Sequence, residues 1–251
     1  MAAFPQVGSL MDPDWLQSPQ GKEYLSCILR KRKRKYFGLL ERPVLSPQFP
    51  TDIARYKIFV SGKSGVGKTS LIAKLAGLEV PSIHHETTGI QTTCVYWPAC
   101  LRDSERPVIF CFQFWDCGEA AIRKFDHIMP ACKEKADAVL FLFSFTDRSS
   151  FEDVPALMSR TLSDDEAMAR VVIGTKLDQY MHTDVTEQDL WDFQQTWHLP
   201  VMRVRSVNSP QLSDGRGLDG RVGIADASPV LNELAELLWH RDQVSAGLTS
   251  E

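Results

Sequence analysis

The chain has 251 residues, of which 43% are hydrophobic and 24% are charged, and this composition excludes disorder along its whole length. Its 28 basic and 32 acidic residues leave a net charge of −4, so we expect no nucleic-acid partner. The six cysteines form no C-x-x-C pair, which excludes the common metal-site spacings and is typical of reduced thiols. The sequence shows no secretory signal, no apolar run long enough to span a bilayer and no lipidation motif. We therefore expect a cytoplasmic protein without a lipid anchor.

Residues 1–53 read as an N-terminal extension that precedes the main domain. Residues 1–22 are rich in Pro, Ser, Gln and Gly, which predicts a flexible start. Apolar residues at near-helical spacing then predict a helix over residues 22–40, and three prolines after it predict a stiff linker.

Six consecutive cations, residues 30–35, interrupt the apolar face of this predicted helix. They could form a solvated helix face, pack on a partner, or make a peripheral contact with acidic lipid. A nuclear signal is a further interpretation, whereas nucleic-acid binding is disfavoured because few aromatic residues flank the run.

Residues 54–243 alternate between predicted strands and helices, and residues 244–251 read as a flexible tail. The continuous apolar run at 138–143 is typical of an interior parallel strand. The alternation predicts a doubly wound α/β fold, with a mostly parallel six-stranded sheet and helices on both faces. The predicted strands are 56–61, 91–97, 108–115, 138–145, 170–174 and 201–205, and the predicted helices are 67–77, 119–132, 149–162, 186–197 and 228–242.

Two features of the second half of the domain are expected to be structural. The segment 208–226 holds several Gly, Asp and Arg residues, which predicts a long surface loop or a short hairpin. Trp191, Phe193 and Trp197 cluster around one predicted helix, and we expect them to lie in the core.

The most specific motif lies between the first predicted strand and the helix that follows it. Residues 62–69 read GKSGVGKT and fit the P-loop pattern G-x-x-x-x-G-K-[ST]. The glycines permit a tight turn whose N–H groups point at phosphate oxygens, and the helix N-terminus also favours an anion. Lys68 supplies a positive charge for the outer phosphates, and the Thr69 hydroxyl suits Mg²⁺. The residues expected to contact the nucleotide phosphates are Gly62, Ser64, Gly65, Val66, Gly67, Lys68, Thr69 and Ser70.

A second motif, Thr175-Lys176-Leu177-Asp178, follows a predicted strand, so it should lie at the same edge of the sheet as the P-loop. The Asp178 carboxylate can accept two hydrogen bonds from guanine, whereas adenine offers no such pair of donors. The stem of Lys176 can lie along the base and the ribose. An exposed charged turn is the alternative interpretation, but a P-loop at the expected distance upstream favours a guanine site.

Together these motifs resemble the Ras superfamily of small GTPases, with Rab-like features, over residues 54–243. The TTGI sequence at 87–90 is similar to switch I of that family, and Thr87 lies 18 residues after Thr69. The resemblance implies the P-loop small-GTPase fold, with GTP and GDP as ligands and Mg²⁺ as the metal. It implies that Thr69 and Thr87 ligate this metal, and that Ser206 supports the base where the family has S-A-K.

The segment after the third predicted strand departs from the family at switch II. The family reads W-D-[TA]-A-G-Q-E, whereas this chain reads W-D-C-G-E from Trp115 to Glu119 and is one residue shorter. The resemblance still implies that Asp116 contacts Mg²⁺ through water and that Gly118 meets the γ-phosphate.

Glu119 stands where the family has its water-positioning glutamine, and it is the candidate catalytic residue. A carboxylate beside the γ-phosphate is repelled by its charge and cannot donate a hydrogen bond as an amide does, so we expect slow intrinsic hydrolysis. The alternative is that Glu119 faces solvent and a partner completes the site.

Five further segments carry a closer resemblance, namely 21–25, 37–45, 84–91, 114–119 and 178–185. They are similar to the Rem- and Rab-like small GTPases that act in ciliogenesis and planar polarity. This resemblance implies a subunit of the planar polarity effector complex, with Fuzzy and Inturned as protein partners, at the cytoskeleton of the ciliary basal body. It implies a role in cilium biogenesis and in targeted membrane and protein transport, including exocytosis.

Three functional classes fit the sequence. The first is a GTP-operated switch whose partners bind one nucleotide state. The second is a constitutively GTP-bound interaction module with little or no GTPase activity, which the altered switch II favours. The third is an ATP-dependent enzyme, which Lys176 and Asp178 disfavour.

Overall fold

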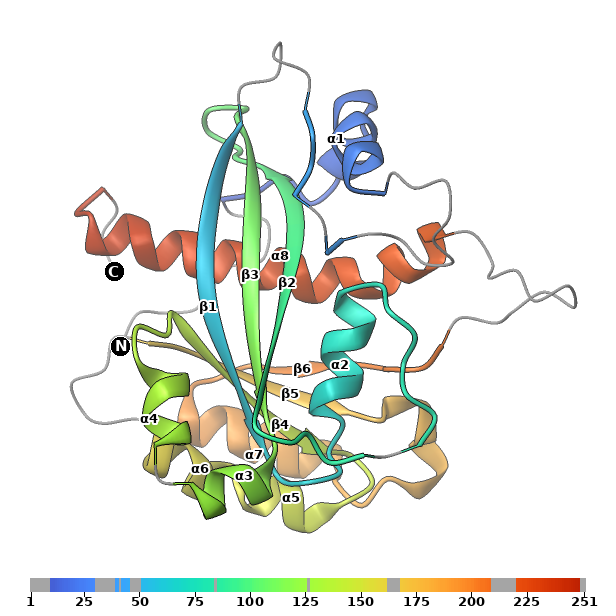
Figure 1. Cartoon of the computed structure of the whole chain (residues 1–251), viewed down its shortest axis with the longest axis vertical. Helices are drawn as coiled ribbons and strands as arrows, with labels where there is room; N and C mark the ends of the chain where they lie inside the picture. The colour runs from blue at the N-terminus through green and yellow to red at the C-terminus, as the bar shows by residue number, and fades with distance from the viewer. Residues whose placement is uncertain are drawn as a thin grey trace, which may run out of the picture.

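A six-stranded sheet forms the centre of the molecule, as the sequence predicts (Figure 1). Its strands stand in the order β2-β3-β1-β4-β5-β6, and all neighbouring pairs are parallel except β2 and β3. The strands are β1 (Asp52–Gly62), β2 (Ile90–Cys100), β3 (Pro107–Cys117), β4 (Ala138–Ser144), β5 (Ala169–Thr175) and β6 (Val201–Arg203). The computed structural model describes residues 10–29, 39–40, 42–45, 51–83, 85–125, 127–161, 168–208 and 220–248.

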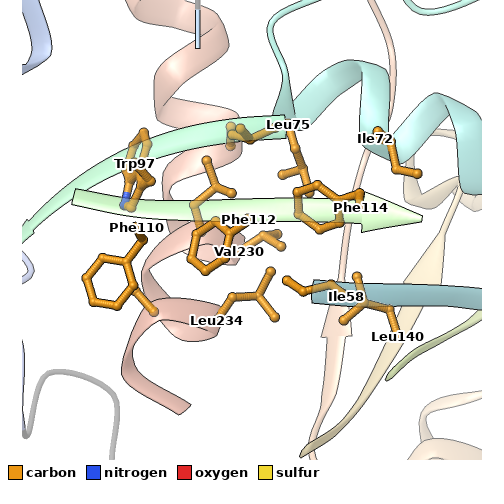
Figure 2. Close-up of a cluster of buried hydrophobic side chains, with 14 of the residues drawn as sticks. Ile58, Ile72, Leu75, Trp97, Phe110, Phe112, Phe114, Leu140, Val230 and Leu234 are labelled. Atoms are coloured by element: carbon orange, nitrogen blue, oxygen red, sulfur yellow. The ribbon is translucent and has the colours of Figure 1, made fainter. Parts of the chain in front are cut away.

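Helices cover both faces of the sheet, because its central strands are apolar on both sides. One face carries α2 (Lys68–Leu75) and the long α8 (Gly220–Ser245). Figure 2 shows this half of the core, where aromatic side chains of β3 face Val230 and Leu234 of α8. The other face carries α3 (Glu119–Lys124), α4 (Ile128–Lys133), α5 (Arg148–Glu152), α6 (Val154–Thr161) and α7 (Glu187–Trp197).

Two predicted helices are each divided in the structure. The helix expected over 119–132 is interrupted at Phe125, whose backbone is extended, and α4 then begins with a proline in its first turn. The helix expected over 149–162 is likewise divided into α5 and α6, and α6 also has a proline in its first turn. A proline lacks the N–H that a continuous helix needs but fits the first turn of a new one, so it explains each restart.

The loop expected over 208–226 is shorter than predicted. Residues 220–226 are helical and form the first turns of α8, so the prediction was wrong there, and residues 209–219 lie outside the described part of the chain. Two short 3₁₀ helices, η1 (Trp15–Gln17) and η2 (Leu177–His182), were not predicted. None of the described helices is long and apolar enough to cross a membrane.

Residues 10–29 pack on the edge strand β2, so the flexible start expected over residues 1–22 was wrong over residues 10–22, and residues 1–9 lie outside the described part of the chain. Met11 forms an antiparallel bridge with Leu101, and the N–H of Asp12 donates to the Cys100 carbonyl at 3.0 Å. The helix α1 (Pro19–Leu29) follows, a few residues earlier than the predicted start at residue 22. Residues 30–38, with all six consecutive cations, lie outside the described residues.

Candidate functional site

A cavity of about 910 Å³ opens at the carboxyl ends of the parallel strands, the edge where ligands bind in doubly wound sheets. Segments far apart in the sequence line it, namely the P-loop, the stretch 80–92, the start of α3, and the ends of β5 and β6. The predicted site residues that line it are Ser64, Gly65, Gly67, Lys68, Thr69, Ser70, Thr87, Gly118, Glu119, Thr175, Lys176, Asp178 and Ser206. Three others, Gly62, Val66 and Asp116, do not line it.

The P-loop has the backbone that its glycines were expected to permit. Gly65 and Gly67 have φ angles of 81° and 100°, in the left-handed region that favours glycine, and Gly67 is the N-cap of α2. A Cβ atom at Gly62 would lie 2.6 Å from the Leu142 carbonyl oxygen, so a side chain there would force β1 and β4 apart. The loop is therefore set by backbone geometry, and its N–H groups lie at a helix N-terminus.

Lys68 is almost completely buried at the base of the P-loop. Its Nζ donates to the carbonyl oxygens of Gly62 at 2.8 Å and Lys63 at 3.1 Å, which holds the ammonium group inside the loop. Burial lowers the pKa of Lys68, while three carboxylates, those of Asp116, Glu119 and Glu86, oppose this change. A buried ammonium group at the base of a P-loop suits a site that receives phosphate groups.

Three oxygen-bearing side chains meet where the sequence predicts the metal ligands. Thr69 Oγ1 lies 3.1 Å from Thr87 Oγ1 and 2.5 Å from Asp116 Oδ2, and Thr87 Oγ1 lies 3.3 Å from the same carboxylate oxygen. The second oxygen, Asp116 Oδ1, is buried and has no hydrogen-bond partner among the residues that the structure describes. Hydroxyl and carboxylate oxygens are the ligands that Mg²⁺ prefers, and an unsatisfied buried carboxylate oxygen fits a hydrated cation. These residues therefore fit the metal.

The two segments that resemble switches touch each other directly. A Cβ atom at Gly118 would lie 2.1 Å from the Thr87 carbonyl oxygen, so only glycine fits there. The Glu86 carboxylate accepts a hydrogen bond from the N–H of Ala120 at 2.8 Å, in the first turn of α3. Glu86 was not predicted as a site residue, and no motif marks a glutamate at this position.

Glu119 points into the cavity and contacts the P-loop. Its Oε2 accepts a hydrogen bond from the Ser64 N–H at 2.8 Å, and its other oxygen forms an ion pair with Arg123. Burial alone would raise the pKa of Glu119, but the Ser64 N–H and the Arg123 guanidinium lower it below its usual value. The side chain is therefore a carboxylate at neutral pH, next to the loop that would hold phosphates.

The other end of the cavity holds the residues predicted to bind the base. Thr175 Oγ1 lies within bonding distance of the carbonyl oxygens of Val66 and Phe143, which ties the second motif to the P-loop. Asp178 is the second residue of η2 and lines the cavity. The Ser206 hydroxyl is buried and has no partner within the described part of the chain, so it is available to a bound base.

Two further side chains shape this end, and the sequence did not single them out. Asn208 Oδ1 accepts from the N–H of Val80 at 2.6 Å, and its Nδ2 donates to the Val80 carbonyl at 2.9 Å. Lys74 donates to the Val207 carbonyl at 3.1 Å and pairs with Asp226 of α8 at 2.7 Å. The sequence does carry one signal for Asn208, because the family has lysine at this position of its S-A-K element.

Comparison with known proteins agrees with this geometry. The family model described as Ras family matches residues 57–213. The chain is 76% identical over 248 residues to the Xenopus tropicalis protein named ciliogenesis and planar polarity effector 2, covering 99% of this chain and 97% of that protein. It is 63% identical to the human protein of the same name, with 99% and 96% covered. Human GTP-binding protein REM 2 is 33% identical over 105 residues, which cover 42% of this chain and 29% of that protein. From the matching family model, and from relatives similar along almost the whole chain, we conclude that this protein belongs to the Ras family.

Proposed function

We propose that this protein is a guanine-nucleotide-dependent switch that acts in ciliogenesis and planar polarity. The observation that carries the proposal is one cavity that joins the P-loop, the Thr69–Thr87–Asp116 cluster and the Asp178 end. We take residues 54–243 as its GTPase domain, after an N-terminal extension of residues 1–53 and before a tail of residues 244–251. The observed strand β1 begins at Asp52, and α8 ends at Ser245.

The residues of the cavity divide into a phosphate end and a base end. At the phosphate end, the P-loop N–H groups and Lys68 bind the phosphates of GTP or GDP. Thr69 and Thr87 would hold Mg²⁺ directly, with Asp116 acting through water, and the ion would neutralise phosphate charge when bound. At the base end, Asp178 accepts from guanine, which selects it over adenine.

Hydrolysis by the isolated protein should be slow, because Glu119 stands where an amide would orient the attacking water. Its hydrogen bond from Ser64 and its ion pair with Arg123 keep it charged, so it cannot donate a hydrogen bond as an amide does, and it adds negative charge near the phosphates. We expect a turnover below about 10⁻⁴ s⁻¹, the scale of ordinary unassisted small GTPases. Single-turnover release of phosphate from bound GTP measures it, and a faster rate would contradict this assignment of Glu119.

The names of the similar proteins, which describe effectors of ciliogenesis and planar polarity, support the biological part of the proposal. We propose that the chain works with protein partners of the planar polarity effector complex, Fuzzy and Inturned, at the basal body. Its output would be cilium biogenesis through targeted transport, including exocytosis. Any peripheral membrane contact would come through partners or through the cations of residues 30–35.

A second candidate function is a constitutive module that holds GTP as a structural cofactor. The Glu119 side chain favours it, because a site that hydrolyses slowly remains in one nucleotide state for long periods. The two functions differ in whether partners distinguish the two nucleotide states.

Two measurements test the proposal. Chromatography of nucleotide released from denatured protein should show GTP or GDP, and the absence of both would refute guanine-nucleotide binding. Binding of the Fuzzy and Inturned complex should then be compared between protein loaded with GDP and protein loaded with a non-hydrolysable GTP analogue. A difference of at least about tenfold is expected for a switch, whereas equal affinity would select the constitutive module.

A further inference from the structure

Two glutamates connect the segments that resemble switch I and switch II to each other and to the P-loop, at the phosphate end of the cavity. Glu119 Oε2 accepts from the Ser64 N–H at 2.8 Å, joining the start of α3 to the P-loop across 55 positions of sequence. Glu86 Oε1 accepts from the Ala120 N–H at 2.8 Å, joining the stretch before Thr87 to the same turn of α3. Both side chains line the cavity. We call this pair, with the two N–H groups that it binds, the acidic latch.

The acidic latch places two carboxylates where the phosphates of a bound nucleotide would also bring negative charge. Glu119 and Glu86 lie close enough to Lys68 to interact with its ammonium group, as does Asp116. Lys68 and the P-loop are the positive elements of this end, so each carboxylate competes with a phosphate for the same attraction. The Ser64 N–H adds to this competition, because a carboxylate already occupies a donor of the phosphate-binding loop.

We propose that the acidic latch makes the isolated protein prefer a nucleoside diphosphate over a nucleoside triphosphate, with Glu119 as the residue that decides the preference. The inference rests on the proposed guanine-nucleotide binding. A diphosphate leaves the latch closed, since the family resemblance places only the third phosphate near Thr87 and Gly118. A triphosphate adds charge beside Glu119 and displaces its carboxylate from Ser64. Triphosphate binding therefore opens the contact between the P-loop and α3.

Arg123 provides a second test, because its positive charge partly offsets the negative charge of Glu119. The guanidinium forms an i,i+4 ion pair with Glu119 on the same helix and is largely exposed. Removing the glutamate charge should favour the triphosphate, whereas removing the arginine leaves that charge uncompensated and should favour the diphosphate further. The two substitutions thus change the preference in opposite directions.

The experiment measures the dissociation constants of GDP and of a non-hydrolysable GTP analogue for the full chain and its variants. Glu119→Gln should raise the relative affinity for the triphosphate about tenfold, with GDP affinity changed less than about twofold. Arg123→Gln should lower the relative affinity for the triphosphate about threefold. Glu152→Gln is the matched control, since Glu152 also pairs with an arginine at i,i+4, namely Arg148, and does not line the cavity. It should leave the ratio unchanged.

The outcomes separate this inference from the proposed function. If neither nucleotide binds the natural protein, both are refuted. If both nucleotides bind but Glu119→Gln leaves their ratio unchanged, or alters both affinities equally, only the acidic latch is refuted.

Discussion

Asn208 shows how one side chain can position a wall of the nucleotide cavity without touching a nucleotide. Its amide group bonds both the N–H and the carbonyl of Val80, as a neighbouring strand would. Val80 begins the stretch that leads to Thr87, and residues 80–83 line the cavity. The family lysine could not accept the N–H bond, so this departure gives the chain a link between its base end and switch I.

Asn208→Ala should therefore release nucleotide faster. The two lost hydrogen bonds are worth about 1 kcal/mol each, so we expect about thirtyfold faster dissociation of a fluorescent GDP analogue. The control is Asn232→Ala. This variant also removes a hydrogen bond of a side-chain amide, which Trp97 Nε1 donates to Asn232 Oδ1 at 2.7 Å, but Asn232 does not line the cavity. Equal acceleration in both variants would show that general destabilisation, and not the Val80 contact, controls release.

Asp178→Asn tests the residue that we propose recognises the base. An amide presents one acceptor and one donor, so it cannot accept both guanine donors, and its own donor opposes one of them. We expect preference for GTP over xanthosine triphosphate to fall by at least about 100-fold, measured by competition against a fluorescent nucleotide. An unchanged preference would remove Asp178 from the base site.

Residues before the main domain cover the edge strand β2 of the sheet. The edge strand β2 exposes backbone groups that would otherwise invite pairing with another chain. Here residues 10–12 bond to its far end, and the Leu39 carbonyl accepts from the Tyr96 N–H at 2.8 Å. A small cluster of Trp15, Tyr24 and Cys100 anchors this cover. The described residues of the N-terminal extension thus pack against the sheet of the main domain.

Trp15→Ala should consequently destabilise the whole domain. The Trp15 side chain is 5% exposed, its ring is tilted against that of Tyr24 with centroids 5.3 Å apart, and its Nε1–H donates to Gln20 at 3.1 Å. We expect a loss of about 3 kcal/mol in the free energy of unfolding, measured with urea. Trp191→Ala is the matched control, because Trp191 is 57% exposed on α7 and should cost less than about 0.5 kcal/mol. Similar values for both would mean that the N-terminal cover contributes nothing.

The two tryptophans also show where sequence patterns reach their limit. The helix period led us to expect Trp191 in the core with its neighbours, and Phe193 is indeed buried, but Trp191 faces solvent. The composition around Trp15 predicted a flexible start, yet its side chain is buried. Periodicity identifies an element and its approximate apolar face, whereas burial depends on which other elements pack against it.

The behaviour of the whole molecule at alkaline pH follows from its buried thiols. Burial, together with the neighbouring Cys117, raises the pKa of the Cys132 thiol to about 12. Burial also raises the pKa of Cys111 and of Cys117 itself. Each group is protonated when folded but ionises near its ordinary pKa when unfolded. The stability that they contribute is complete below about pH 9 and is lost as the pH rises towards 12.

We therefore expect the free energy of unfolding to fall steadily as the pH rises above about 9. Cys132→Ala should be less stable at pH 7.5 because it leaves a small cavity, and its stability should fall less steeply with pH. Urea unfolding at a series of pH values measures both slopes. Parallel curves for the natural chain and the variant would show that the Cys132 thiol does not contribute.

The amino-acid sequence alone was enough to predict the alternation of strands and helices, the P-loop, the guanine motif and the family resemblance. These features are local, since each needs only a few adjacent residues with a given period or spacing. They predicted the six-stranded sheet and most of the residues that line the cavity. Thr87 and Asp116 entered the site only through the family resemblance, because neither belongs to a local motif.

Which charges and amides meet around the cavity could be seen only in the folded chain. The bonds from Ser64 to Glu119 and from Asn208 to Val80 join positions 55 and 128 residues apart, and no local pattern encodes such a contact. The same is true of the N-terminal cover on β2, where the Leu10 N–H reaches Glu236 of α8 at 2.8 Å. Contacts of this kind depend on how packed elements bring distant backbone groups together. They bring the carboxylate of Glu119 to the P-loop and the carboxylate of Glu86 to the first turn of α3.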